Sequence, residues 1–213
     1  AMLEMNLAPS KIDIGLLTAE YIESRSNNPI KFLSKKLDYI VNANTDNNNA
    51  KDVILFGFGR IGRLAARELI KQAGKGQQLK LKAIVVRNLT NDQLVKRAAL
   101  LRNDSVHGSF KGVVDVDLSS KSIIVNGQMI KFIDGANPEK IDYTKFGINN
   151  ALLIDNTGAF TDKESLSRHL SSKGVSKVLL TAPGKEIPNI VYGINSKNLD
   201  IEKNNIFSAA SCT

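Results

Sequence analysis

Cys212 is the only cysteine in the sequence, and its neighbours favour covalent chemistry. It lies in a run of small residues, SAASCT at 208–213, directly after a short apolar run that predicts a strand. If the chain turns into a helix there, the positive helix end would stabilise a thiolate, the form that attacks carbonyl carbon. A lone cysteine judged in isolation is more often a buried structural thiol. Both interpretations stay open at this point.

A glycine-rich loop at residues 57–62 (GFGRIG) is the second candidate site. It matches Gly-x-Gly-x-x-Gly between an apolar run typical of a strand and a helical pattern. We expect Gly57 to permit a tight turn, Gly59 to let the backbone approach a pyrophosphate, and Gly62 to let helix and strand pack closely. The positive helix end would then face the anion. A plain glycine turn is the alternative, but the alternating elements around the loop favour a dinucleotide.

The residues after the second predicted strand bear on which dinucleotide binds. An acidic residue usually stands there and accepts hydrogen bonds from the adenosine ribose hydroxyls. Here Val86 is followed by Arg87 and Asn88, and the first acidic residue afterwards is Asp92. Arg87 could pair with a 2′-phosphate, which predicts NADP. In the alternative, Arg87 faces solvent and Asn88 bonds a ribose hydroxyl; these residues favour neither reading over the other.

The elements that must position these residues are short β-branched runs alternating with helical periodicity. Strands are predicted at residues 53–56, 81–86, 113–118, 122–125, 129–132, 152–155, 177–181, 190–192 and 206–208, and helices at 61–72, 94–101 and 163–173. Asn126-Gly127 is a strong hairpin signal, so the middle strands should be partly antiparallel. The alternation predicts an α/β fold over residues 51–213, with a Rossmann-type, doubly wound and mostly parallel sheet.

Residues 1–50 are predicted to form a helical N-terminal extension and a linker. Apolar residues recur at helical spacing between residues 10 and 40. Asn27-Asn28-Pro29 separates two helices, because the residue before a proline is disfavoured in the helical region. Residues 42–49 are a polar linker. The helices would pack on the main domain or on a neighbouring subunit, with a loosely attached arm as the alternative.

Composition argues against several classes of protein. The 213 residues are 42% hydrophobic, enough to bury a core. Without a membrane-length apolar run or a signal peptide, the chain is expected to be cytoplasmic and free of membrane contact. One cysteine and two histidines predict no disulfide and no metal site. The net charge of +8 favours an anionic partner, but scattered lysines argue against nucleic acid.

The sequence resembles glyceraldehyde-3-phosphate dehydrogenase in an ordered set of short blocks. They are GFGRIGR at 57–63, DSVHG at 104–108, VNG at 125–127, TGAFT at 157–161, TAP at 181–183, GIN at 193–195 and SAASCT at 208–213. The last resembles the family's SNASCT, which carries the nucleophile. The resemblance implies the coenzyme-binding half of the phosphorylating enzyme, ending one residue after the cysteine. The helical extension resembles the longer bacterial-type members.

The resemblance also implies which residues bind the coenzyme, NAD or NADP. They are Gly57, Gly59, Arg60, Ile61, Gly62, Arg87, Asn88, Thr157, Gly158 and Thr181. Two departures from the family pattern bear on strict NAD preference. Asn88 replaces a usual aspartate, and residues 134–137 (DGAN) replace an arginine that typically contacts the adenosine side.

For the chemistry, the resemblance implies that Cys212 is the nucleophile and that Ser211 and Thr213 bind glyceraldehyde 3-phosphate or inorganic phosphate. The thiolate attacks the aldehyde, hydride passes to the nicotinamide, and phosphate cleaves the resulting thioester. His107 would be structural. The histidine base would lie beyond Thr213 in a second domain, so the 213 residues alone are expected to be inactive.

The full-length family members are tetramers, so the resemblance also implies a homo-oligomer, acting in glycolysis or gluconeogenesis. Two alternatives remain from the residues. One is a non-catalytic nucleotide-binding module. The other is an erythrose-4-phosphate dehydrogenase, because the matching blocks concern the coenzyme and the thiol more than the length of the sugar.

Overall fold

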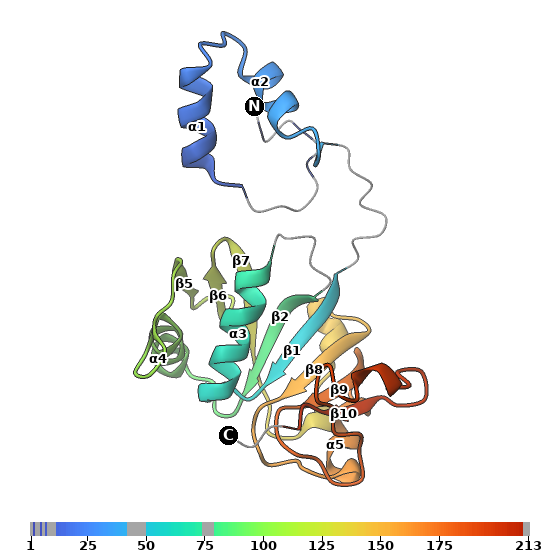
Figure 1. Ribbon diagram of the computed structural model, residues 1–213. Coiled ribbons are helices and arrows are strands. Elements are labelled where there is room, and N and C mark those ends of the chain that lie inside the picture. The colour runs from blue at the N-terminus through green and yellow to red at the C-terminus, as the bar shows by residue number, and fades with distance from the viewer. Residues whose placement is uncertain are drawn as a thin grey trace. The chain divides into compact units, whose positions relative to one another are not determined.

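The computed structural model describes residues 2, 5, 7, 12–41, 50–73 and 79–210 (Figure 1). By its internal contacts the chain divides into two units, residues 1–50 with 72–78, and residues 51–71 with 79–213. The predicted linker at 42–49 and the three residues Ser211, Cys212 and Thr213 lie outside the described residues. The glycine loop and the strands around it belong to the second unit.

The first unit contains the two helices that the spacing predicts, α1 (Ile14–Glu23) and α2 (Pro29–Lys36). Pro29 is the first residue of α2, where its missing amide costs nothing because that amide has no helical partner. Asn28 caps the helix, and its side chain accepts a hydrogen bond from a first-turn amide. The rings of Tyr21 and Phe32 pack edge to face with centroids 5.3 Å apart, which holds the two helices together.

The described part of the second unit forms an eight-stranded sheet in the order β10-β9-β8-β1-β2-β7-β6-β5. Its strands are β1 (Lys51–Phe56), β2 (Leu79–Val86), β5 (Val114–Asp117), β6 (Ser122–Val125), β7 (Gln128–Asp134), β8 (Ala151–Asp155), β9 (Val175–Leu180) and β10 (Ile206–Ser208). All neighbouring pairs from β10 to β7 are parallel, and β6 and β5 extend the edge in antiparallel fashion. The parallel part has the strand order of the Rossmann fold, which confirms the predicted fold class.

Helices cover both faces of this sheet. They are α3 (Arg60–Gln72), α4 (Asn91–Arg102) and α5 (Lys163–Leu170), and Figure 1 shows α3 lying along one face. Alternate residues of β1 point to opposite faces, so Val53 and Leu55 join the core with α3 and α4, while Ile54 and Phe56 join the core with α5. Within the described residues, no helix combines the length and apolar content that crossing a bilayer requires.

Shorter elements join these strands and helices. They are the two-residue strands β3 (Asn103–Asp104) and β4 (Gly108–Ser109), and the 3₁₀ turns η3 (Pro138–Lys140), η4 (Tyr143–Phe146) and η5 (Ser196–Asn198). The hairpin predicted at Asn126-Gly127 joins β6 to β7, and both residues have positive φ, 50° and 80°. Such values match the turn type that fits the twist of antiparallel strands.

Two predicted elements differ from the structure. The strand predicted at 190–192 is absent: Ile190 donates one hydrogen bond to the carbonyl of Ser208, and the chain then turns, leaving Tyr192 95% exposed. The helix predicted to reach residue 173 ends at Leu170 instead. Its continuation is replaced by a turn in which the buried Ser172 hydroxyl donates to the carbonyl of Pro138 at 2.6 Å.

Candidate functional site

A pocket of about 520 Å³ lies at the carboxyl ends of β1, β2 and β8. Its walls come from the glycine loop after β1, the residues after β2, two residues after β7, and residues 156–160 after β8. The strand order reverses direction between the neighbouring strands β1 and β8. Ligands of open α/β sheets bind at such a switch point, so the topology by itself marks this pocket as a binding site.

The glycine loop has the geometry that the sequence predicts. Gly57 has φ +92°, and a Cβ there would lie 2.8 Å from Thr157 Cγ2. A Cβ on Gly62 would lie 2.4 Å from the carbonyl oxygen of Gly57, so the first turn of α3 packs directly on the loop. A Cβ on Gly59 would meet nothing within 4 Å, so this stretch of backbone is open to a ligand.

The amino end of α3 follows this open stretch of backbone. The amide of Arg63 donates a hydrogen bond to the carbonyl of Gly59 at 3.0 Å, which begins the helical ladder of α3. The amides of the preceding turn have no place in the helical ladder and remain for a ligand or solvent. Arg60 and Ile61, on this turn, are exposed. Free amides and the helix dipole together favour an anion such as a pyrophosphate.

The β2 side of the pocket carries four polar side chains, Arg87, Asn88, Gln93 and Arg97. Arg87 and Asn88 follow β2 directly, and the other two belong to α4. Asn88 has φ +56°, a conformation that asparagine tolerates better than most residues. Sequence reasoning missed Arg97. The available signal was its helical spacing, since it lies three residues after the buried Leu94 and so faces inward.

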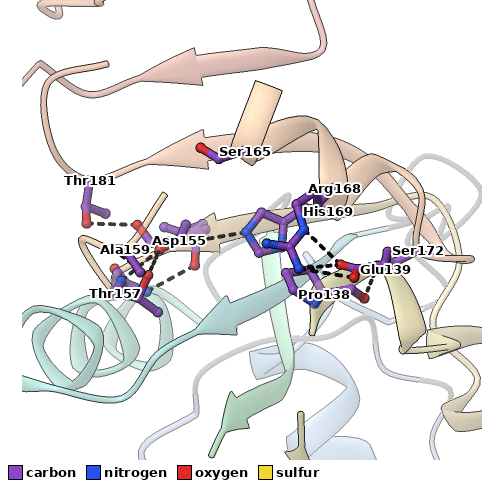
Figure 2. Close-up of polar contacts among 12 residues, drawn as sticks. Pro138, Glu139, Asp155, Thr157, Ala159, Ser165, Arg168, His169, Ser172 and Thr181 are labelled. Carbon is purple, nitrogen blue, oxygen red and sulfur yellow. Dashed lines mark hydrogen bonds and ion pairs between the residues drawn. The ribbon is translucent and has the colours of Figure 1, made fainter. Parts of the chain in front are cut away.

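The β8 side is built around the buried pair of Asp155 and His169 (Figure 2). One carboxylate oxygen of Asp155 accepts hydrogen bonds from the backbone amide and the hydroxyl of Thr157, both at 2.7 Å. The other lies 2.8 Å from His169 Nε2 on α5. The backbone carbonyl of Asp155 accepts from the amide and hydroxyl of Thr181, at 3.1 and 3.0 Å.

Asp155 therefore ties together three segments that are distant in sequence. These are the loop that begins at Thr157, the residue after β9, and α5. Sequence reasoning placed Asp155 only at a strand end and did not single out His169. The missed signal was a histidine three residues after Leu166 on the buried face of a helix, where an imidazole needs a polar partner.

The predicted coenzyme contacts fall into three groups. Those that line the pocket are Gly57, Gly59, Arg87, Asn88 and Thr157; Arg60, Ile61 and Gly62 form the first turn of α3; Gly158 and Thr181 lie outside the lining. Gly135 and Ala136, from the segment 134–137 singled out in the sequence, also line the pocket.

The chain leaves the sheet on the same side as the pocket. β10 is parallel to β9, which is parallel to β8, so all three have their carboxyl ends at the edge where the glycine loop lies. After β10, the Ala209 amide donates to the carbonyl of Leu180 at 2.8 Å, and Ala210 has φ +54°. The described chain thus heads toward this edge two residues before Cys212.

A second charged cluster beside α3 is centred on the carboxylate of Asp104. Asp104 accepts hydrogen bonds from the backbone amides of His107 and Val106, both at 3.0 Å, and contacts His107 Nδ1 at 3.1 Å. Arg63 Nη2 completes the cluster at 3.4 Å from the Asp104 carboxylate. These contacts, the His107 amide first, hold the pKa of Asp104 well below its usual range. His107 is thus engaged in its own loop, away from the pocket lining.

Known proteins resemble this chain closely enough to assign its family. Residues 51–163 match the family model described as glyceraldehyde 3-phosphate dehydrogenase, NAD binding domain. A glyceraldehyde-3-phosphate dehydrogenase-like protein of Pseudomonas aeruginosa is 45% identical over 216 aligned residues, covering all of this chain and 47% of that protein. Glyceraldehyde-3-phosphate dehydrogenases of Trichormus variabilis and Chlamydia pneumoniae are 40% and 36% identical over 162 residues, 76% of this chain and 45% of each relative.

The chain spans about half the length of these curated relatives. The matched family model begins with the first residue of β1 and includes the glycine loop, the residues after β2 and the loop after β8. It therefore covers the segments that build the pocket. On this match, the chain belongs to the glyceraldehyde 3-phosphate dehydrogenase family and carries its NAD-binding domain.

Proposed function

We propose that this chain is the coenzyme-binding half of an NAD(P)-dependent, phosphorylating glyceraldehyde-3-phosphate dehydrogenase. The observation that carries the proposal is the open glycine loop at the switch point of a sheet that matches the family's NAD-binding model. In this proposal residues 51–213 are the coenzyme-binding domain and residues 1–50 an extension. The alignment with the Pseudomonas relative, which includes the extension, supports a longer form of the enzyme.

The pocket fits an extended dinucleotide bound across the edge of the sheet. The pyrophosphate lies against Gly57 and Gly59 and the first turn of α3, where Arg60 and Ile61 add contacts and Gly62 allows close packing. The adenosine ribose then lies beside Arg87 and Asn88. Thr157, Gly158 and Thr181 would hold the nicotinamide end, and the carbonyl of Asp155 fixes the position of Thr181.

The reaction we assign needs a nucleophile beside the nicotinamide end. Cys212 comes four residues after β10 in the sequence, and β10 ends at this edge of the sheet, which supports the role of Cys212 as that nucleophile. Its thiolate attacks the aldehyde carbon of glyceraldehyde 3-phosphate to give a hemithioacetal. The bound coenzyme supplies a hydride acceptor, which leaves a thioester on Cys212. Ser211 and Thr213 hold the substrate or inorganic phosphate, whose attack releases the acyl phosphate and restores the thiol.

Neither histidine in these 213 residues is placed to act as the base. His169 is fully buried and bound to Asp155, and His107 is bound in the Asp104 loop. In this proposal the base comes from outside these 213 residues, so the 213 residues alone are expected not to oxidise the aldehyde. We further propose a cytoplasmic homo-tetramer that serves glycolysis or gluconeogenesis. Both NAD and NADP remain candidates for the coenzyme.

The test is a Cys212→Ser substitution in the complete protein. Aldehyde oxidation should fall by more than about a thousandfold, as for other lost nucleophiles, while coenzyme affinity stays unchanged. Glyceraldehyde 3-phosphate and erythrose 4-phosphate are compared as substrates, with inorganic phosphate present or withheld. Full activity of the serine variant would contradict the assignment of Cys212 as the nucleophile. Faster turnover of erythrose 4-phosphate would instead reassign the substrate.

A further inference from the structure

Arg97 lines the pocket and has no ion-pair partner among the residues that the structure describes. It belongs to the second turn of α4, between the buried Leu94 and Leu101. Its Nε atom is buried and has no hydrogen-bond partner among the described residues. Burial, together with the positive charge of Arg63, lowers the pKa of Arg97. A cation held this way is unfavourable unless an anion compensates it.

No carboxylate in the described chain supplies that compensation. The carboxylate that contacts the neighbouring Arg63 is Asp104, and it also accepts the two loop amides and contacts His107. Arg97 itself takes part in no ion pair among residues 12–41, 50–73 and 79–210. The residues lining the pocket include two arginines and no aspartate or glutamate. The site is thus built to receive negative charge.

Three further polar side chains of this wall are also free. Arg87, Asn88 and Gln93 line the same pocket, and in the part of the chain that the structure describes none of their side chains makes a hydrogen bond. Arg87 and Asn88 stand where an acidic residue usually binds the hydroxyls of the adenosine ribose. The four side chains therefore line this side of the pocket with hydrogen-bond donors, two of them charged.

We propose that Arg97 and Arg87 together bind a phosphate on the 2′-oxygen of the adenosine ribose, so that Arg97 selects NADP over NAD. This inference rests on the proposed coenzyme function. A phosphomonoester carries between one and two negative charges at neutral pH, and arginine can hold two of its oxygens at once. Gln93 and Asn88 supply neutral donors for the remaining oxygens. The pyrophosphate is bound separately, by the loop and the first turn of α3.

The test measures binding of NAD and NADP to the unsubstituted protein and to Arg97→Gln by titration calorimetry. The substitution should weaken NADP binding by about tenfold to a hundredfold, the usual effect of losing a charged hydrogen bond, and change NAD binding by less than about twofold. Lys96→Gln is the matched control, because Lys96 is exposed on the same helix and absent from the pocket lining. It should leave both affinities unchanged.

A second pair of ligands tests the adenosine end directly. Adenosine 2′,5′-bisphosphate and AMP differ only by the 2′-phosphate and contain no nicotinamide. The bisphosphate should bind more tightly to the unsubstituted protein, and Arg97→Gln should remove most of that difference. Raising the salt concentration should reduce the same difference, because surface-accessible charge pairs are screened.

Each other outcome contradicts a specific statement. If Arg97→Gln weakens NAD and NADP equally, Arg97 contacts the shared adenosine and the inference is wrong. It is also wrong if the protein binds NAD but not NADP, although the proposed coenzyme function then stands. If inorganic phosphate displaces the bisphosphate as readily as NADP does, the arginines form a general anion site. If neither dinucleotide binds, the proposed function itself fails.

Discussion

The two ends of the pocket are built in opposite ways. At the β8 end, most polar groups bind one another: Asp155 binds Thr157, Thr181 and His169 inside the protein (Figure 2), while the buried Nδ1 of His169 has no hydrogen-bond partner among the described residues. At the β2 end, Arg87 and Arg97 line the pocket and have no ion-pair partner within the described ranges. Both ends lie at the carboxyl edge of the same sheet.

This difference separates groups that hold the site in shape from groups that are free to bind. A buried polar network contributes rigidity through its internal hydrogen bonds, and loss of one member leaves its partners unpaired. Cations with no internal partner contribute nothing comparable to folding, and their electrostatic interactions are left for a ligand. Substitutions at the β8 end should therefore act mainly on stability. Substitutions at the β2 end should act mainly on binding.

The largest effect is expected from Asp155→Ala. It removes the acceptor for Thr157 and leaves His169 buried without its partner, which should lower the free energy of unfolding by about 3–5 kcal/mol. Urea denaturation measures the change. Asp115→Ala is the control, since Asp115 is exposed on β5, and it should change stability by less than about 0.5 kcal/mol. Equal stability of the two variants would contradict a structural role for the β8 end.

Gly62→Ala and Gly59→Ala should separate packing from binding within one loop. In Gly62→Ala the new methyl group would lie 2.4 Å from the carbonyl oxygen of Gly57. We therefore expect the free energy of unfolding to fall by about 1–3 kcal/mol. In Gly59→Ala the new methyl group would meet nothing within 4 Å. Its free energy of unfolding should therefore stay within about 0.5 kcal/mol of that of the unsubstituted protein. Coenzyme affinity should nonetheless fall in Gly59→Ala. Thermal unfolding and calorimetric titration of both variants test this contrast.

A smaller effect on stability is expected when the pH is lowered, through the carboxyl group of Asp104. The pKa of Asp104 is lowered from its ordinary value of 3.8, chiefly by the backbone amides of His107 and Val106. A lowered pKa in the folded state stabilises the protein above the unfolded value, and that contribution is lost as the pH falls below it. Asp104→Asn should therefore lose less stability than the unsubstituted protein between about pH 5 and pH 3. An identical pH dependence of urea unfolding in both proteins would contradict this.

The smallest effect on stability is expected from Arg97→Gln. Removing a cation that has no partner and lies near Arg63 relieves repulsion, so the unfolding free energy should stay within about 0.5 kcal/mol or rise slightly. The same urea titration used for Asp155→Ala measures it. A clear loss of stability would mean that Arg97 supports the fold, and the contrast between the two ends of the pocket would no longer hold.

Local patterns were enough to predict much of this molecule. The alternation of strands and helices, the glycine loop and the Asn126-Gly127 hairpin each depend on residues within a few positions of one another. Their geometry follows from side-chain periodicity and from which residues tolerate positive φ. The fold class and the family were both predicted correctly from these patterns. The absent strand at 190–192 shows the limit, since a short apolar run forms a strand only where a neighbouring strand pairs with it.

The sequence by itself thus determined the fold class, the glycine loop and the family, and it named Arg87 as a residue that could bear on coenzyme choice. Only the tertiary structure brought Arg97 to the same pocket as Arg87 and placed His169 against Asp155. Both relationships join residues on different elements, and their contacts depend on how a helix packs on the sheet. The physical reason is that burial and the presence or absence of a partner are properties of the packed chain, and these decide what a charged side chain does.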